Sequence, residues 1–122
     1  MSKIIVTGGS GFIGSHIVSA LEKKDHKVYV VDKVNTINSK NYFDLDINNT
    51  SKLENLLKEN KIEYVYHIAA IANARRSLED VLETVDVNIR GTASVLKACS
   101  NSGVKKVILA STVWVYNACQ KK

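Results

Sequence analysis

The chain has 122 residues, of which 45% are hydrophobic and 24% charged, proportions that predict one globular domain and exclude both a disordered chain and a two-domain enzyme. Its 17 basic and 12 acidic residues give a formal net charge of +5, but the basic residues are scattered, four pairs among them, without interleaved aromatic residues, so we expect no nucleic-acid partner. No apolar run approaches the roughly 18 residues of a membrane span, so we expect a soluble, unexported chain with no membrane partner.

Short runs rich in β-branched residues alternate along the sequence with longer patterns of helical period. This alternation predicts successive βα units and hence a parallel sheet. A glycine loop follows the first predicted strand and leads into a helix whose apolar stripe includes Ile13, Ile17 and Leu21. The five predicted strands cover, in chain order, residues 3–7, 27–32, 41–45, 64–68 and 106–110.

Two further helices are predicted to begin at capping boxes, in which a serine and a following acidic residue each bond the other's backbone amide. Ser51 with Glu54 opens a helix that runs to about residue 60, and Ser77 with Asp80 opens the longest helix, which ends before Gly103. One apolar stripe of the longest helix is expected to pack on the sheet, namely Leu78, Leu82, Val85, Ile89, Ala93 and Leu96. This stripe is widened by Val81, Val95 and Cys99 beyond what one sheet face needs, which predicts that the helix also contacts a partner.

Gly8, Gly11 and Gly14 lie between the first strand and the first helix, which is the arrangement that a dinucleotide site needs. The first glycine permits a tight turn, the second lets backbone amides approach a pyrophosphate, and the third allows close packing of helix on strand. Asp32 ends the second strand eighteen residues after Gly14, where a carboxylate accepts from both ribose hydroxyls and repels a 2′-phosphate. The pattern predicts NAD in preference to NADP; the alternative is that the glycines serve only a structural turn.

The segment from Thr7 to His16, TGGSGFIGSH, resembles the cofactor loop of the extended short-chain dehydrogenase/reductases, in the NAD-dependent epimerase/dehydratase family. Four more segments resemble motifs of that family in the same order: DLDI at 44–47, HIAA at 67–70, NIRGT at 88–92 and LASTVWVY at 109–116. Asn117 stands where the family has a glycine. Together the five segments extend over nearly the whole chain.

This resemblance implies a Rossmann-like, doubly wound α/β fold whose five strands lie in the order 3-2-1-4-5, without the later strands of the family. It implies NAD as the cofactor and a nucleotide-sugar substrate in the full-length family, contacted at the position of Thr112. The cofactor contacts then fall on Gly8, Gly11, Phe12, Ile13, Gly14, Asp32, Asp46, Ile47, Ile68, Ala69, Ala70 and Asn88.

Hydride transfer in the family depends on a Tyr-x-x-x-Lys pair in a later helix, where the lysine and the cofactor favour the phenolate that takes a sugar hydroxyl proton. The chain ends before that helix, and Tyr116 is followed four residues later by Gln120. Residues 1–122 are therefore expected to form an incomplete NAD-binding domain without the substrate-binding C-terminal region. Three functions stay open: the NAD-binding portion of a nucleotide-sugar epimerase, dehydratase or reductase; a non-catalytic NAD or nucleotide-binding module; and a subunit completed by another chain.

The last sequence features concern assembly and location. The fifth strand, KVILA, has neither proline nor an inward charge to protect it as an edge, so we expect marginal stability and self-association, for example as a homodimer. Cys99 and Cys119 lie twenty residues apart without metal-ligand spacing, and the three histidines match no metal motif. We therefore expect a cytoplasmic protein with neither a disulfide framework nor a metal.

Overall fold

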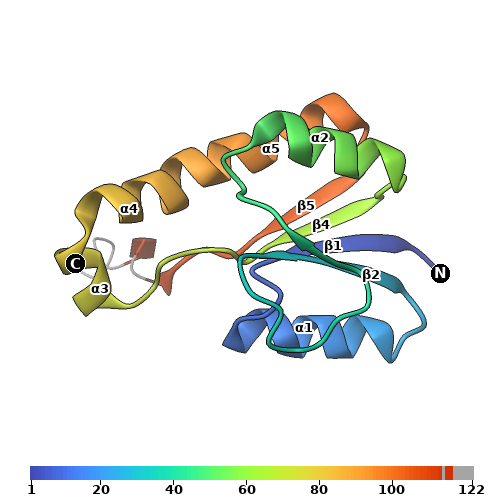
Figure 1. Cartoon of the computed structure of the whole chain (residues 1–122), viewed down its shortest axis with the longest axis horizontal. Coiled ribbons are helices and arrows are strands. Elements are labelled where there is room, and N and C mark those ends of the chain that lie inside the picture. Colours follow the sequence, from blue (N-terminus) through green and yellow to red (C-terminus); the bar gives the residue numbers. More distant parts are fainter. Residues whose placement is uncertain (114, 117–122) are drawn as a thin grey trace.

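The computed structural model describes residues 1–113, 115 and 116, in which five parallel strands form one sheet in the order β3-β2-β1-β4-β5 (Figure 1). The strands are β1 (Lys3–Thr7), β2 (Lys27–Asp32), β3 (Tyr42–Asp44), β4 (Tyr64–His67) and β5 (Lys106–Leu109). The predicted fold class and strand order are confirmed. Each predicted strand is present, three of them shortened by one or two residues.

Helices cover both faces of the sheet, as a doubly wound fold requires (Figure 1). α1 (Phe12–Glu22) packs on one face, where Val18 joins strand residues in a small apolar core. α2 (Thr50–Glu59) and α5 (Thr92–Ser102) pack together on the other face. The larger core between these two helices and the sheet includes Ile5, Tyr29, Val31, Leu53, Leu57, Val65, Val95 and Ala98.

The first predicted capping box is wrong, because α2 begins at Asn49 rather than at Ser51. Asn49 Oδ1 accepts from the backbone amide of Lys52 at 3.1 Å. Glu54 does not reach back to the helix start, since it bonds the side chains of Lys58 and Asn101. Asparagine caps a helix as well as serine does, so the cap position depends on where the preceding loop leaves the sheet.

The second capping box is replaced by two short helices. Asn73 Oδ1 accepts from Arg76 N at 3.1 Å and begins α3 (Ala74–Glu79). Asp80, predicted as the acidic end of the box, is itself a cap: its Oδ1 accepts from Glu83 N at 2.9 Å and begins α4 (Val81–Val85). The chain therefore turns at Asp80 before the long helical stretch starts.

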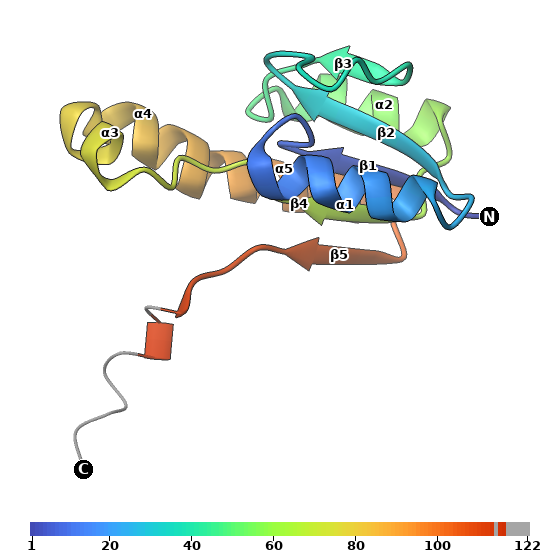
Figure 2. The same cartoon turned by 90° about the horizontal axis from the view of Figure 1, so that it is seen from below.

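From α4 the helix continues through a π-helical segment, η1 (Asp86–Gly91), into α5, which ends at Gly103 in the predicted left-handed conformation. The apolar stripe expected to pack on the sheet is exposed instead: Leu78, Leu82, Val85, Ile89, Ala93 and Leu96. One reason is that α3 and α4 project beyond the sheet (Figures 1 and 2). Another is that the wider π turn rotates the face of the following helix. Val95 and Cys99, expected to reach a partner, belong to the chain's own core.

β5 pairs only with β4 within the described residues, so it forms an edge of the sheet as predicted. Val107 packs against the larger core, whereas Leu109 is exposed. α1 contacts β1 and β2 and lies away from β5 (Figure 2). In the part of the chain that the structure describes, no helix is both long and apolar enough to cross a membrane.

Two valines on the long helix test the corrected helix face. Val95 is 0% exposed and Val85 is 45% exposed. Val95→Ala should lower the free energy of unfolding by about 2 kcal/mol, because it removes buried methyl groups and leaves a cavity. The matched Val85→Ala should change it by less than about 0.5 kcal/mol. Urea unfolding of a monomeric sample measures both values, and a larger loss for Val85→Ala would contradict the assigned face.

Candidate cofactor-binding groove

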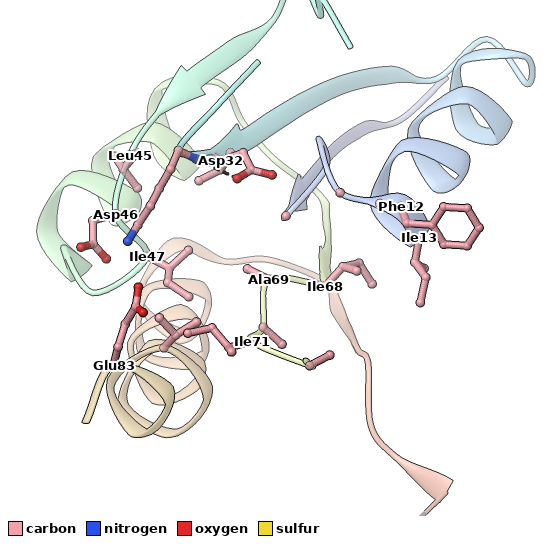
Figure 3. Close-up of a pocket in the computed structure, with 18 of the residues that line it drawn as sticks. Phe12, Ile13, Asp32, Leu45, Asp46, Ile47, Ile68, Ala69, Ile71 and Glu83 are labelled. Atoms are coloured by element: carbon pink, nitrogen blue, oxygen red, sulfur yellow. Dashed lines mark hydrogen bonds between the residues drawn. The ribbon is translucent and has the colours of Figure 1, made fainter. Parts of the chain in front are cut away.

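A groove lies at the carboxyl ends of β1, β2 and β4, the edge at which parallel α/β sheets bind ligands (Figure 3). Its volume of about 440 Å³ is within the range of small-molecule sites. Five parts of the chain meet there: residues 8–14, 31–33, 45–47 and 68–72, and three residues between 76 and 87. Every residue predicted to contact the cofactor lines the groove, with the exception of Asn88: Gly8, Gly11, Phe12, Ile13, Gly14, Asp32, Asp46, Ile47, Ile68, Ala69 and Ala70.

The glycine loop packs backbone against backbone at the base of the groove. Gly8 has a φ of +69°, and a Cβ there would lie 2.7 Å from the amide nitrogen of Ala69. A Cβ on Gly14 would overlap the carbonyl oxygen of Gly8. Gly11 differs, because its Cβ would approach a single atom, the Gly8 oxygen, at 3.3 Å. The space beside Gly11 is therefore left open by the fold and belongs to the groove.

α1 begins at the groove without a capping side chain. Gly11 occupies the N-cap position, and the first helical donor, Ser15 N, bonds its carbonyl at 2.9 Å. The amides of Phe12, Ile13 and Gly14 precede that donor, so they have no partner from a preceding helical turn. Uncapped amides at the positive end of a helix dipole bind phosphate groups.

Asp32 ends β2 beside the glycine loop and is held there by two backbone amides. Its Oδ2 accepts from Ser10 N at 3.0 Å and its Oδ1 from Lys33 N at 2.8 Å. The Tyr42 hydroxyl donates to the Asp32 carbonyl at 3.0 Å, and desolvation, followed by the charges of Asp44 and Asp32, raises the pKa of Tyr42. Each carboxylate oxygen of Asp32 retains a lone pair that a ribose hydroxyl can use.

One wall of the groove is apolar and is held in position by residues that lie behind it. Ser94 Oγ donates to the carbonyl of Ile47 at 2.6 Å. Gly91 lets η1 approach the same residue, since a Cβ on Gly91 would lie 2.5 Å from Ile47 Cδ1. The apolar side chains lining this part of the groove are Leu45, Ile47, Ile68, Ala69, Ile71 and Val87. They form a surface suited to the flat face of a base.

Two polar residues lie beneath the floor of the groove, the segment from Ile68 to Ile71, and hold it in position. The His67 ring is 2% exposed, with Nδ1 2.6 Å from Thr7 Oγ1 and Nε2 3.0 Å from Thr92 Oγ1. Burial lowers the pKa of His67, and neither hydroxyl supplies a charge that would stabilise an imidazolium. Asn88 lies outside the groove lining and clamps Ile71: its Oδ1 accepts from Ile71 N at 2.8 Å and its Nδ2 donates to Ile71 O at 2.9 Å.

Other residues singled out in the sequence lie elsewhere. Thr112, expected to contact a substrate, lies past β5 and outside the groove lining. Burial raises the pKa of the Cys99 thiol to about 11, so this thiol stays protonated at neutral pH. Cys119 lies outside the described residues. Within residues 1–113 and 115–116, no three His, Cys, Asp or Glu side chains gather as a metal site would require.

Several residues that shape the groove are not among the predicted cofactor contacts. Leu45 and Ile71 line it, and each lies within or beside a motif segment whose other members were assigned. Gly91, which approaches Ile47 closely, lies inside the NIRGT segment, so a glycine within a motif is its sequence signal. The hydrogen bonds around His67 had no such signal, because they join residues far apart in the chain.

A family model described as the NAD dependent epimerase/dehydratase family matches residues 4–122. The chain belongs to this family. Its curated relatives include a UDP-glucose 4-epimerase of Klebsiella pneumoniae, 33% identical, with 93% of this chain and 91% of the relative covered. A dTDP-D-glucose 4,6-dehydratase of Dictyostelium discoideum is also 33% identical, with 97% of this chain and 30% of the relative covered.

Solved structures of the epimerase/dehydratase family share the fold. A UDP-glucose-4-epimerase from Stenotrophomonas maltophila, with bound NAD and formylated UDP-arabinopyranose, superimposes with a TM-score of 0.87 and 29% identity over 95% of this chain and 38% of that one. A Thermus thermophilus UDP-glucose 4-epimerase complex with NAD superimposes with a TM-score of 0.81 and 36% identity, over 90% of this chain and 37% of that one. The chain thus spans less than two fifths of the length of these two proteins, and corresponds to their NAD-binding portion.

Stability should depend on pH through His67. Burial lowers the pKa of His67 below its ordinary value of 6.5, so the unfolded state binds a proton on this ring more readily than the folded state does. The free energy of unfolding therefore falls as the pH drops through 6.5 toward the pKa of the folded state. The unfolding midpoint should therefore decrease between about pH 7.5 and about pH 5.5, and less so in His67→Asn, which cannot titrate. Scanning calorimetry of both proteins measures the difference, and equal slopes would contradict the burial of a neutral ring.

Proposed function

We propose that the groove binds NAD, with the pyrophosphate on the first-turn amides of α1, the adenosine ribose on Asp32, and the adenine beside Asp46 and Ile47. The observation that carries this proposal is that three surfaces of different chemistry converge there: uncapped amides, a carboxylate and an apolar wall. The remaining contacts are assigned to Gly8, Gly11, Phe12, Ile13, Gly14, Ile68, Ala69 and Ala70. When bound, NAD supplies reversible hydride transfer.

The chain's own residues bind and orient the cofactor rather than move protons. The charged side chains that line the groove are Asp32, Lys33, Asp46, Arg76 and Glu83. Arg76 and Glu83 form an ion pair at 2.9 Å, and Asp32 is held by two amides. No lining residue of the described chain is a tyrosine or histidine placed to accept a sugar proton. We therefore propose that proton transfer uses a group from outside the described residues.

We propose that the whole protein acts on a nucleotide-sugar as an epimerase or dehydratase, with residues 1–122 as its NAD-binding domain. The curated relatives include UDP-glucose 4-epimerases and a dTDP-D-glucose 4,6-dehydratase, which supports this substrate class. Thr112 follows the edge strand β5, and we assign it the substrate contact. The free, buried Cys99 is compatible with the reducing cytoplasm, which we propose as its location.

We also propose that the chain self-associates through the exposed face of the long helix. On the long helix Leu82 is 83% exposed and Ile89 is 66% exposed, and Leu78 in the preceding α3 is 81% exposed. Contiguous exposed apolar side chains of this size usually mark a protein contact. This observation favours the third of the candidate functions, in which another chain completes the subunit.

Gly11→Val tests the cofactor groove. The fold leaves space beside Gly11, so valine should be tolerated while its branches fill the room assigned to the pyrophosphate. We expect NAD affinity to fall by about a hundredfold or more. Gly11→Ala, with a single methyl group, is the matched control and should give an intermediate loss. Calorimetric titration measures the affinity, thermal unfolding verifies the fold, and unchanged affinity in folded Gly11→Val would refute the site.

Asp32→Asn tests the cofactor preference. Asparagine keeps an oxygen that can accept from Ser10 N, so the glycine loop stays in place while the negative charge is removed. NAD should bind about tenfold more weakly, because a charge-assisted hydrogen bond is lost, and the preference over NADP should narrow. Competition binding with the two cofactors gives both numbers. Tighter binding of NADP than of NAD by the unmodified chain would show that the assignment of Asp32 is wrong.

Leu82→Lys tests self-association. A charge placed on the exposed stripe should oppose burial of that face, so the substituted chain should sediment as a monomer at concentrations where the unmodified chain associates. Lys24→Ala, at an exposed position in the turn after α1, is the control and should associate as the unmodified chain does. Sedimentation velocity over a wide concentration range distinguishes them, and association that survives Leu82→Lys would place the contact elsewhere.

A further inference from the structure

Five hydrogen bonds connect the end of β1, the end of β4 and the long helix beneath the groove. Ala69 N donates to Thr7 Oγ1 at 3.3 Å, and the Thr7 hydroxyl lies 2.6 Å from His67 Nδ1. On the other side of the ring, Nε2 lies 3.0 Å from Thr92 Oγ1, and the Thr92 hydroxyl donates to the carbonyl of Asn88 at 2.8 Å. The fifth is the donation from Ile68 N to the Thr7 carbonyl at 3.1 Å, which ties the same two strand ends together.

The direction of donation along this series of hydrogen bonds follows from its last acceptor, the Asn88 carbonyl. A carbonyl oxygen only accepts, so the Thr92 proton is committed to Asn88, and Thr92 Oγ1 must accept from His67 Nε2–H. A neutral imidazole with a proton on Nε2 has a lone pair on Nδ1, so Thr7 donates to it. Thr7 Oγ1 in turn accepts from Ala69 N. Every proton then points the same way, and each polar atom of the chain has a partner.

The residues at both ends of this series of hydrogen bonds contact the floor of the groove. Ala69 lines the groove and contacts the Gly8 backbone so closely that a Cβ on Gly8 would lie 2.7 Å from its nitrogen. Asn88, at the other end, clamps both backbone groups of Ile71, which also lines the groove. The His67 ring is therefore connected by hydrogen bonds to Ala69 through Thr7, and to the residue that clamps Ile71 through Thr92.

We propose that His67 is a positioning residue for the cofactor: its Nε2–H tautomer holds the Thr7 hydroxyl in the orientation that fixes Ala69 and, with it, the floor on which NAD lies. The proposal rests on the proposed NAD site. Burial lowers the pKa of His67 and thereby favours the neutral ring that the tautomer requires. The Thr7 side of the ring acts directly on Ala69, whereas the Thr92 side selects the tautomer.

Substitution of His67 by asparagine or by glutamine tests the two ring nitrogens separately. Asparagine places an acceptor near the position of Nδ1 and can still bond Thr7, whereas glutamine places a donor near the position of Nε2 and can still bond Thr92. We expect His67→Asn to bind NAD within about threefold of the unmodified chain and His67→Gln to bind about tenfold more weakly. Val65→Ala, a core substitution on the same strand without a bond to the floor, should lower the unfolding midpoint and leave NAD affinity unchanged.

A second pair of substitutions avoids changing the ring itself. Thr7→Ser keeps the hydroxyl and should keep NAD affinity, while Thr7→Val is nearly isosteric, removes the hydroxyl and should weaken binding about tenfold. Equal affinity in Thr7→Val and the unmodified chain, or equal losses in His67→Asn and His67→Gln, would overturn the positioning role. A loss of affinity in Val65→Ala as large as that in His67→Gln would show that affinity only follows stability.

The tautomer has its own spectroscopic test, which does not depend on NAD. Nitrogen NMR of the unmodified chain at neutral pH should show Nδ1 of His67 unprotonated and Nε2 protonated. A proton on Nδ1 would contradict the proposed direction of donation even if the chain binds NAD. If the unmodified chain binds no NAD while the tautomer is as expected, the proposed cofactor fails and the hydrogen-bond chain stands as a support of the fold alone.

Discussion

Close contact between backbones at the end of β1 is the constraint on which the groove depends. Gly8 approaches the amide of Ala69, and Gly14 approaches the carbonyl of Gly8, so closely that neither position has room for a side chain. These contacts hold the glycine loop, the end of β4 and the start of α1 at one point. As a result the uncapped amides of α1 face the same groove as Asp32, whose carboxylate is itself bonded to the loop through Ser10.

Side-chain hydrogen bonds, together with the close glycine contacts, hold the groove in shape. The floor from Ile68 to Ile71 is irregular backbone, which needs partners that a strand or helix would otherwise supply. Thr7 provides one partner for Ala69, and Asn88 provides two for Ile71. The apolar wall is fixed in a similar way, since the carbonyl of Ile47 is bonded by Ser94 from α5. The groove is therefore held in shape by buried polar contacts from three separate elements.

Features that depend on local chemistry could be predicted from the sequence. The strands, the glycine loop and Asp32 are read from short patterns, and these patterns fix where the groove lies because parallel strands end at one edge. The face of the long helix could not be predicted, because its hydrophobic period does not reveal the π turn at Asp86–Gly91 or the point where the sheet ends. The hydrogen bonds of His67 depend on strand register: Thr7 lies opposite His67, sixty residues away.

The central claim is that the edge formed by β1, β2 and β4 is a binding site for NAD. Amide chemical-shift mapping with NAD tests it most directly, because it reports every affected residue of the unmodified chain at once. Shifts concentrated at residues 8–14, at Asp32, and in the segments 45–47 and 68–71 would agree with the groove. Shifts concentrated at the opposite edge, for example around Lys61 and Lys105, or no shifts at millimolar NAD, would contradict it.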